Sequence, residues 1–576
     1  MSNHDGNRQR TVTKRTTAFA GIRSIERIAD AGASQMKNFR ILSDGSLEKR
    51  CGYGTVIRSS GRIRGYWEGS ISGVGYRFFV AGTALYRLSQ NDSAPVQLTT
   101  LTASEDRVTF FRFRDLLCLA DGYTLLYFQP ATGLFTVAQG YVPLYGKNWH
   151  PTQLGEVNEP RNLLCNSLRV HYVNSTATQV FQLPFTATRI QSVLVGGEPV
   201  SGYTFRAPSS TVTIPASYAT GGDVVIAFDP DSIFSDRTSV LGAGHASVYR
   251  DGYHETLLTF GGKSPYRVFR TAAVSDEMLA GSRLCYPSSD VLYFRAEDAF
   301  ALGSAEHPVT AAVQHLDRML VFCDTGLWVL RHPSALRDDM EVVLWQGGIG
   351  CVATDGAVLC RGVPIVLSPS GIGRIGLFNS DSDICTLTLI SDDLSDLLTE
   401  AVLRKSLLYW SGKENRIWLR CLDNSDGTVW IADPDGKCWI RYTGVNAVLL
   451  TDCQGSPGFG TADGKIAKFD ETLNTDDGSP FEAVYLSTYL DFPASAGSRR
   501  TGRLQVTANT GGSLLRVEAE TERELHPFRF SGCGQEPPEF FCGRFGTGRF
   551  RFLRYRIIAP GLARTRIYAL SVGATI

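Results

Sequence analysis

One glycine motif in this sequence has the spacing found in dinucleotide-binding proteins. Gly371, Gly373 and Gly376 match the pattern G-x-G-x-x-G. In a dinucleotide site these glycines open a helix whose N-terminus receives the pyrophosphate. Here the last glycine is followed by a loop and an alternating strand, residues 377–389. The motif therefore indicates a tight hairpin turn, and no cofactor is predicted.

Carboxylates gather in two turns, 423–426 and 470–477, which resemble calcium loops. Neither turn has the Gly at position six together with the Glu at position twelve that an EF-hand loop needs. Residues 423–430 also resemble the Asp box of sialidase-type propellers, but only Gly427 and Trp430 of its five fixed positions match. We interpret both clusters as hairpin turns, and incidental cation binding there stays open.

The nine histidines show no zinc-site spacing and no H-E-x-x-H motif. His245 and His254 share one loop, and His526 precedes Cys533 and Cys542. G-x-S-x-G and Walker motifs are also absent from the sequence. We therefore predict a non-enzyme with no catalytic residue and no metal site. One alternative stays open, because carboxylates from separate strands could meet at a glycosidase separation.

Arginine is concentrated near the C-terminus. From Arg499 onward there are 13 Arg and no Lys, against 6 Glu and no Asp. Four of them crowd one expected strand, partly on one face: Arg549, Arg551, Arg554 and Arg556. The N-terminal arm carries a second basic set: Arg8, Arg10, Lys14 and Arg15. We predict subunit-interface or phosphate contacts for both sets. A solvated strand face is the alternative for the first, and a disordered arm for the second.

Short strands must position all these residues. Six segments consist of an apolar strand, a turn with Gly or Asp, and a second apolar strand, and they begin at Tyr76, Leu116, Met319, Pro364, Thr428 and Gly458. Such turns allow the positive φ of a tight hairpin. Hairpins recurring about every forty residues are typical of β-propeller blades. The sequence therefore predicts an all-β fold with an irregular propeller of about six or seven blades, and unrelated sandwich hairpins are the alternative.

Three segments depart from this pattern. Alternating strands over 159–232 predict a small β-sandwich inserted in a blade loop. Residues 391–405 predict one short amphipathic helix that begins at a Ser cap. Longer strands after 476 predict an antiparallel C-terminal β-domain. The predicted order is an N-terminal arm and opening segment (1–52), first blades (53–158), inserted sandwich (159–232), remaining blades (233–475) and C-terminal β-domain (476–576).

Composition supports a folded chain of 576 residues with several structural units, because 43% of the residues are hydrophobic and 20% charged. Lys plus Arg and Asp plus Glu both number 57, so net charge indicates no strongly charged partner. No apolar run is long enough for a membrane span, and no secretory leader is expected. Seven of the 13 cysteines lie among alternating or apolar residues and are predicted to be reduced core residues: Cys118, Cys323, Cys351, Cys360, Cys385, Cys421 and Cys438.

The opening segment, residues 24–56, contains the pattern N-x5-D-G-x-L-x-x-R-x-G-Y. Its matching residues are Asn38, Asp44, Gly45, Leu47, Arg50, Gly52 and Tyr53. This segment resembles the opening of a bacteriophage virion family that includes tail nozzle, neck and hub proteins. The inserted strands, and a central segment running from Tyr293 to Trp328, resemble parts of the same family in the same order. The resemblance covers residues 24–430 with gaps, and Cys51 stands where the family often has Pro.

The resemblance implies a homo-oligomeric ring, commonly six-fold, in the tail tube or nozzle. It implies contacts with adaptor or portal-side proteins, with distal spikes or fibres, and transiently with viral DNA, but no membrane segment. The expected location is the virion tail, after assembly in the bacterial cytoplasm. Two alternatives stay open: a receptor-binding or glycan-processing propeller of the tail tip, and a cellular scaffold propeller unrelated to phage.

Overall fold

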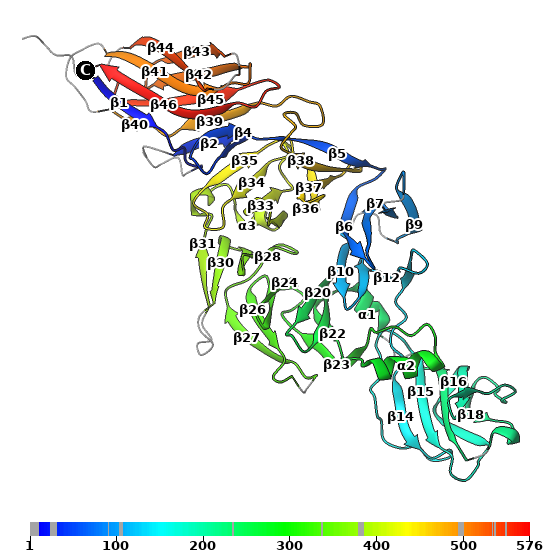
Figure 1. Ribbon diagram of the computed structural model, residues 1–576. Coiled ribbons are helices and arrows are strands. Elements are labelled where there is room, and N and C mark those ends of the chain that lie inside the picture. Colours follow the sequence, from blue (N-terminus) through cyan, green and yellow to red (C-terminus); the bar gives the residue numbers. More distant parts are fainter. Residues whose placement is uncertain are drawn as a thin grey trace, which may run out of the picture. The chain divides into compact units, whose positions relative to one another are not determined.

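The computed structural model describes residues 11–575, apart from 23–31, 90–91, 103–106, 220, 233–235, 336–337, 378–384, 493–499, 533, 535–536 and 548–549. These residues form two compact units. Unit 1 contains residues 1–63 and 351–576, and unit 2 contains residues 64–350. Figure 1 shows that strands dominate both units, which confirms the predicted all-β fold class.

Unit 2 contains four antiparallel sheets of four strands each. Each sheet is built like a propeller blade, from strands that follow one another in the chain. In the third sheet an inserted helix separates the last two strands. The first sheet contains β6 (Ile63–Ile71), β7 (Val74–Ala81), β8 (Ala84–Ser89) and β9 (Val96–Thr100). The second sheet contains β10 (Thr109–Phe113), β11 (Leu116–Ala120), β12 (Leu125–Gln129) and β13 (Leu134–Val137). The third sheet contains β20 (His245–Arg250), β21 (Glu255–Gly261), β22 (Ser264–Thr271) and β23 (Phe294–Ala301). The fourth sheet contains β24 (Val309–His315), β25 (Arg318–Cys323), β26 (Gly326–Arg331) and β27 (Glu341–Gly347).

The turn between β6 and β7 illustrates why these segments reverse so tightly. Only Ser72 and Gly73 separate the two strands, and their φ angles are 49° and 80°. Two successive residues with positive φ make the type I′ turn that matches the twist of a hairpin. All six hairpins predicted from the sequence occur as adjacent paired strands.

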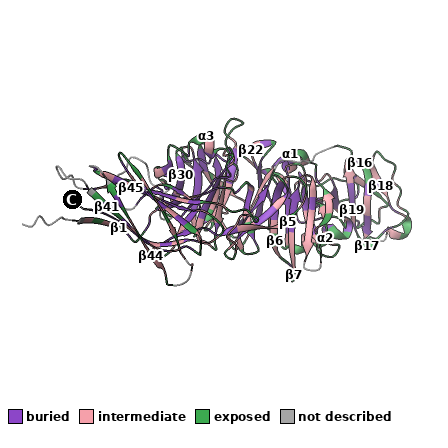
Figure 2. Ribbon diagram, turned by 90° about the horizontal axis from the view of Figure 1, so that it is seen from above, coloured by how far each residue is buried: buried purple, intermediate pink, exposed green. Residues whose placement is uncertain are grey.

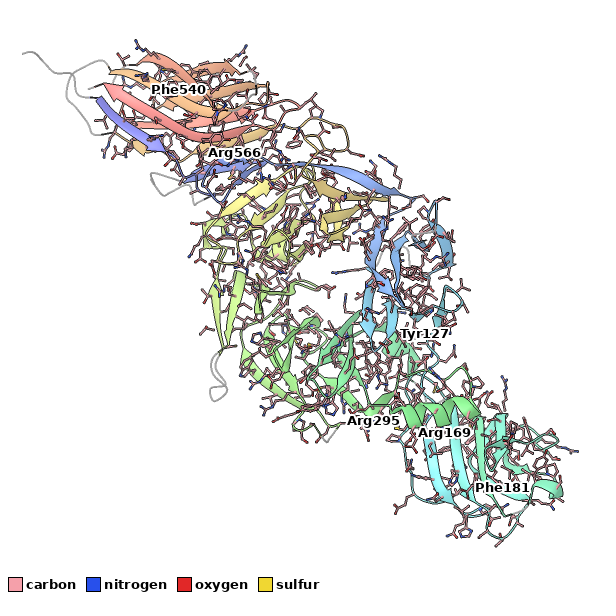
Figure 3. The ribbon with its side chains drawn as sticks, in the orientation of Figure 1. Tyr127, Arg169, Phe181, Arg295, Phe540 and Arg566 are labelled. Atoms are coloured by element: carbon pink, nitrogen blue, oxygen red, sulfur yellow. The ribbon has the colours of Figure 1, made fainter. Side chains whose placement is uncertain are left out.

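A six-stranded sheet over 144–230 interrupts the blades of unit 2. Its strands are β14 (Leu144–Trp149), β15 (Leu168–Val173), β16 (Val180–Val195), β17 (Glu198–Pro199), β18 (Ser209–Thr213) and β19 (Asp223–Pro230), with a 3-10 turn η1 (Ala216–Tyr218). β16 pairs mainly with β18 along its first half and with β19 along its second, with register shifts between. Phe181 and Tyr172 are fully buried in this sheet's own core (Figure 3). The sheet begins at Leu144, before the predicted limit at 159.

Two helices in unit 2 were not predicted from the sequence, α1 (Arg237–Gly242) and α2 (Asp276–Cys285). The Ser275 hydroxyl caps α2 by accepting a hydrogen bond from the Met278 amide at 3.2 Å. Two acidic residues, Asp276 and Glu277, occupy its first turn. These are ordinary helix-start signals.

Unit 1 contains three further blade-like sheets. The first contains β28 (Ala357–Cys360), β29 (Val363–Ser368), β30 (Gly371–Leu377) and β31 (Cys385–Leu389). The second contains β32 (Ser406–Ser411), β33 (Arg416–Cys421), β34 (Val429–Ala432) and β35 (Trp439–Tyr442). The third consists of β36 (Ala447–Cys453), β37 (Ser456–Thr461), β38 (Lys465–Asp470) and β5 (Gly52–Arg58). Because β5 comes from the N-terminal segment, this last sheet joins distant parts of the chain.

The C-terminal strands of unit 1 form two antiparallel layers that include N-terminal strands. One layer contains β39 (Ala483–Ser487), β40 (Leu490–Asp491), β42 (Leu514–Thr521), β43 (Leu525–Ser531) and β45 (Phe552–Ala559). The other contains β1 (Thr11–Thr16), β3 (Phe39–Ile41), β4 (Leu47–Lys49), β41 (Arg500–Asn509), β44 (Glu539–Thr547) and β46 (Arg566–Thr575). β2 (Ala33–Lys37) pairs with both β35 and β39, so one sheet continues from a blade into this domain. Buried residues, purple in Figure 2, gather along these strands.

The predicted helix over 391–405 is wrong. The structure has a 3-10 turn, η2 (Asp392–Leu394), and a one-turn helix, α3 (Glu400–Leu403). The Ser391 hydroxyl accepts a hydrogen bond from the Ile372 amide at 2.9 Å and does not cap a helix. Leu394, Leu398 and Leu403 are each buried. Tertiary packing therefore outweighs the helical pattern of this segment.

The seven cysteines predicted as core residues are free thiols, and all are buried except the half-buried Cys438. Burial raises the pKa of Cys323 and of Cys360 to about 11. Such thiols stay protonated and unreactive at neutral pH. Among the residues that the structure describes, no helix combines the length and the apolar composition that a bilayer span requires.

Candidate functional site

The seven matching residues of the opening segment lie together in unit 1, between the blade that β5 completes and the C-terminal domain. We call this set the opening clasp: Asn38, Asp44, Gly45, Leu47, Arg50, Gly52 and Tyr53. It contains the short antiparallel pair β3–β4 and the start of β5. Leu47, at the start of β4, is fully buried in the core of unit 1. Sequence spacing alone did not indicate what these residues contact.

Asn38 connects the end of β2 to two distant turns. Its φ is 56°, a left-handed conformation that Asn tolerates better than most residues. Its amide nitrogen donates to the Thr443 hydroxyl at 3.1 Å and to the Glu482 carbonyl at 2.8 Å. Its amide oxygen accepts from the Thr443 amide at 2.9 Å and from Arg50 Nε at 3.1 Å. The carboxamide is therefore fully engaged inside the protein.

Asp44 and Gly45 form the turn between β3 and β4. Asp44 accepts from the Ser46 amide at 3.0 Å and hydroxyl at 2.6 Å, and from Arg566 at 2.6 Å. These hydrogen bonds, those from Ser46 first, lower the pKa of Asp44 to about 2. Gly45 has φ +80°, which suits a residue without a side chain. Because Arg566 begins β46, this turn is fastened to the C-terminal domain (Figure 3).

Arg50 is the centre of the clasp, and its side chain is fully buried. It binds Asp476 with both terminal nitrogens, at 2.8 and 2.6 Å. The same nitrogens donate to the carbonyls of Cys51 at 2.9 Å and Thr443 at 3.1 Å. With the bond from Nε to Asn38, each of the five N–H groups has an acceptor. The guanidinium also stacks 3.9 Å from the ring centroid of Phe481.

Burial raises the pKa of two acidic groups in and beside the clasp, Asp476 and Tyr53. It raises the pKa of the Asp476 carboxyl, although Arg50 lowers it. It also raises the pKa of Tyr53 to about 12. The Tyr53 hydroxyl donates to the Gly444 carbonyl at 2.9 Å, and its ring packs edge-on against Phe459 at 4.9 Å. These groups therefore hold structural elements together, since each hydrogen-bonds to a distant segment of the same unit.

Lys49, next to Arg50, gives the clasp a dependence on pH. Burial, followed by the charge of Arg50, lowers the pKa of Lys49 from 10.5 to about 8. Between these values the Lys49 amine binds more protons in the unfolded chain than in the folded one, so the contribution of Lys49 to the free energy of unfolding rises with pH. Urea denaturation of wild type and Lys49→Met between pH 8 and 10.5 measures this. The slope of the unfolding free energy against pH should be smaller in the variant than in the wild type, and equal slopes in both proteins would contradict the assignment.

The predicted arginine strand is β45, and its guanidinium groups have carboxylate partners. Arg554 lies 2.7 Å from Glu520, and Arg556 lies 3.2 Å from Glu518, both directly opposite on β42. Arg551 lies 3.0 Å from Asp491. Such cross-strand pairs stabilise a sheet surface. These three positions thus face acidic neighbours of the same chain, and Arg549 lies outside the described residues.

These ion pairs lead to a prediction about nucleic acid. Replacing the three pairs together, Arg551, Arg554 and Arg556 by Gln and their partners Asp491 by Asn and Glu520 and Glu518 by Gln, should change the affinity for duplex DNA less than about two-fold at physiological salt. The reason is that paired guanidiniums contribute little positive potential to an approaching phosphate. Fluorescence anisotropy with a labelled duplex measures the affinity. A large loss, accompanied by a shallower salt dependence, would instead assign these residues to phosphate binding.

The N-terminal basic residues divide between described and undescribed parts. Arg8 and Arg10 lie outside the described residues. Lys14 and Arg15 lie in β1, which pairs antiparallel with β46 of the same chain over six residues. This part of the arm is therefore not disordered and is ordered on its own chain, while the subunit-interface or phosphate contact of Lys14 and Arg15 stays a prediction. Alternating β-branched residues in TVTKRT fit a strand, and the edge of β46 offers the pairing.

The segments that resembled ligand motifs are turns and strands. Gly371, Gly373 and Gly376 lie in β30, and the next element that the structure describes is the strand β31. A side chain at Gly373 would come within 2.3 Å of Leu387 on the adjacent strand, so close cross-strand packing explains this glycine. Asp426 accepts hydrogen bonds from the Thr428 amide at 3.0 Å and hydroxyl at 2.6 Å. The hairpin interpretation is confirmed for the glycine motif, which follows the β29–β30 turn, and for 423–426, which join β33 to β34. It is wrong for 470–477, because these residues connect β38 to β39 of another sheet.

A cavity of about 500 Å³ lies beside the clasp within unit 1. Its walls include Tyr442, Phe469 and two carboxylates, Glu414 and Glu471. Burial raises the pKa of Glu414, whereas hydrogen bonds from Arg40 lower that of Glu471. Two carboxylates with pKa values moved apart are what an acid–base pair needs.

The sequence matches no protein-family profile and no curated protein. Among solved structures, the chain is similar to the AfRom2 CNH domain, with 8% identity, coverage of 73% of this chain and 99% of that chain, and a TM-score of 0.34. PorZ, of the type-IX secretion system of Porphyromonas gingivalis, gives 10% identity, 87% and 52% coverage, and a TM-score of 0.29. A functionally unknown protein from Desulfotomaculum acetoxidans gives 10% identity, 65% and 83% coverage, and a TM-score of 0.28.

Proposed function

We propose that this protein is a structural component of a bacteriophage tail, of the axial ring, nozzle or neck and hub type. In this proposal several copies assemble into a ring, expected to be a hexamer, that connects the adaptor or tube to distal tail parts. Viral DNA passes through the ring during ejection. The resemblance of the opening segment to this virion family is one support, and the nature of the opening clasp is the observation that carries the proposal.

The clasp supports a structural role, because the polar side chains of Asn38 and Arg50 hydrogen-bond to other segments of unit 1 and not to a ligand. The Asn38 carboxamide and the Arg50 guanidinium make all their hydrogen bonds inside unit 1. The bonds of Arg50 link the opening segment to residues 393 and 426 positions away in the sequence. A part of an ejection channel needs such rigid joints, since stability located in buried networks resists local opening.

Electron microscopy of the phage particle that carries this gene tests the proposal. The expected result is density for this chain as a ring on the tail axis. Density in the capsid shell, or in a distal fibre away from the axis, would overturn the axial-ring assignment. Sequencing around the gene gives a second test, because terminase, portal and capsid genes should lie nearby. A neighbourhood without virion genes would favour a cellular scaffold.

The cavity beside the clasp favours one second candidate, a glycan-processing propeller of the tail tip. Glu414 would then act as the general acid, because burial raises its pKa. Incubation of the whole protein with host polysaccharide, followed by analysis of reducing ends, tests this activity. Turnover that is lost in Glu414→Gln but kept in Glu400→Gln, an exposed glutamate paired with Arg404, would support it. The structural proposal expects no turnover.

A further inference from the structure

Three side chains of unit 2 that are distant in the sequence meet at one point. Asp251 and His254 lie in the turn between β20 and β21, and His332 follows β26 in the next sheet. One possible ligand atom of each lies within 4.8 Å of those of the other two. All three residues are half-buried, so the cluster is reachable from solvent. We propose that this cluster is a binding site for a divalent d-block cation of the Zn²⁺ class.

The orientation of His332 is fixed in the way that metal-binding histidines usually are. Its Nδ1 lies 3.0 Å from the Asp339 carbonyl, which can only accept a hydrogen bond. Nδ1 therefore carries the proton, and the lone pair is on Nε2. The ring is held between Tyr249, with centroids 5.5 Å apart, and His254, at 4.2 Å. Metal-ligating imidazoles commonly donate their second nitrogen to a carbonyl or carboxylate in this way.

The turn that carries the other two ligands is also preorganised. One oxygen of Asp251 accepts from the amides of Tyr253 at 2.9 Å and His254 at 2.6 Å. Its other oxygen, Oδ2, is left 3.0 Å from His254 Nδ1. Two ligand atoms of a tetrahedral zinc site lie about 3.3 Å apart, since each bond is about 2.0 Å long. A cation can thus replace the proton that Asp251 and His254 share, once the His254 ring turns out of its stack on His332 so that the lone pairs of both imidazoles face the ion.

The donor set determines which cation fits. Two imidazole nitrogens and one carboxylate oxygen suit Zn²⁺, Co²⁺ or Ni²⁺, whereas Mg²⁺ and Ca²⁺ prefer oxygen ligands alone. The Thr256 hydroxyl, 3.3 Å from His332 Nε2, or a water could complete the coordination. A cation here would fasten the β20–β21 turn to the segment after β26, and so join two neighbouring sheets of unit 2. This inference is independent of the proposed tail function.

Titration of the full-length, chelator-treated protein with CoCl2 tests the site. Absorption in the visible range reports tetrahedral nitrogen and oxygen ligation, and calorimetry reports stoichiometry. We expect about one equivalent per chain, displaced by Zn²⁺ and not by Mg²⁺. His254→Gln and His332→Gln should each weaken binding by on the order of 100-fold. Asp251→Asn should also weaken binding, while its amide oxygen keeps the hydrogen bonds of the turn, so a loss there is not a folding defect.

His307→Gln is the matched control, because His307 forms a similar pair with Asp324 at 2.9 Å but is not part of the three-residue cluster. It should bind Co²⁺ like the wild type. Zn²⁺ should also raise the unfolding temperature of the wild type and not of His332→Gln, because the folded state alone brings the ligands together. One equivalent bound equally by wild type and all three cluster variants, or no binding above that of Mg²⁺, would overturn the proposal.

Discussion

Replacing Arg50 by Met is expected to lower the free energy of unfolding of unit 1 by about 3–5 kcal/mol. The side chain of Asp476 is only 10% exposed, and Arg50 supplies its two shortest hydrogen bonds. Met keeps much of the packing volume but leaves that carboxylate without its counter-charge. It also removes the donor to the Cys51 and Thr443 carbonyls, and one of the two donors to the Asn38 amide oxygen. Urea denaturation followed by tryptophan fluorescence measures the loss, because Trp418 and Trp439 are buried in the same core.

A neighbouring ion pair provides the control for this experiment. Arg58 lies 3.1 Å from Asp477, the residue after Asp476, but its side chain is 64% exposed. Arg58→Met should therefore cost less than about 1 kcal/mol. A double variant, Arg50→Met with Asp476→Leu, should recover part of the stability, because removing both charges removes the buried unpaired one. Equal losses in Arg50→Met and Arg58→Met would show that the clasp does not depend on this buried pair.

The hairpins could be predicted because their information is local. An alternating strand, a turn with Gly or Asp and a second alternating strand are close in the sequence, as in β7 and β8 around Gly82. The same holds for β30, where a strand after the three glycines ruled out a dinucleotide site. The burial of the predicted cysteines could be inferred from local sequence too, since the alternation of apolar and polar residues in each strand indicates its buried face.

The role of the opening clasp could not be predicted, because its partners are distant. Arg50 and Asp476 are 426 positions apart, and Arg566 binds Asp44 across 522 positions. Nothing in either local sequence identifies the other. The cluster of His254 and His332 has the same origin, since neighbouring sheets bring the two together. Spacing rules for metal sites apply to ligands on one turn or helix, so they do not detect such a site.

Three further differences from the sequence predictions concern the 391–405 segment, helix α2 and strand β1. The 391–405 segment has helical periodicity, but the Ser391 hydroxyl binds the Ile372 amide and three leucines are buried, so only one turn of helix remains. Helix α2 had a readable signal, a Ser cap followed by two acidic residues, within a segment interpreted as part of the blades. β1 was assigned to a free arm because the pairing edge on β46 lies at the other end of the chain.

Replacing Gly52 by Ala is expected to cost about 3 kcal/mol, the upper end of the range for overpacking a well-packed site. Gly52 is buried at the start of β5, opposite Asp470 on β38. A Cβ atom there would lie 1.9 Å from the carbonyl oxygen of Thr475, which is backbone and cannot rotate away. The segment that holds Asp476 would have to move, so the Arg50 pair should be strained as well.

Gly54→Ala is the matched control on the same strand. Its added Cβ would lie 3.1 Å from Leu473 Cδ1, the end of a flexible side chain that can move aside. The cost should stay below about 1 kcal/mol, partly offset because Ala restricts the unfolded chain more than Gly does. In Arg50→Met, where the neighbouring contact is already lost, Gly52→Ala should cost less than in the wild type, because residues in one network are not additive. If the losses of unfolding free energy from Gly52→Ala and Arg50→Met are additive, the two residues stabilise unit 1 independently. The clasp would then consist of two separate contacts and not of one network.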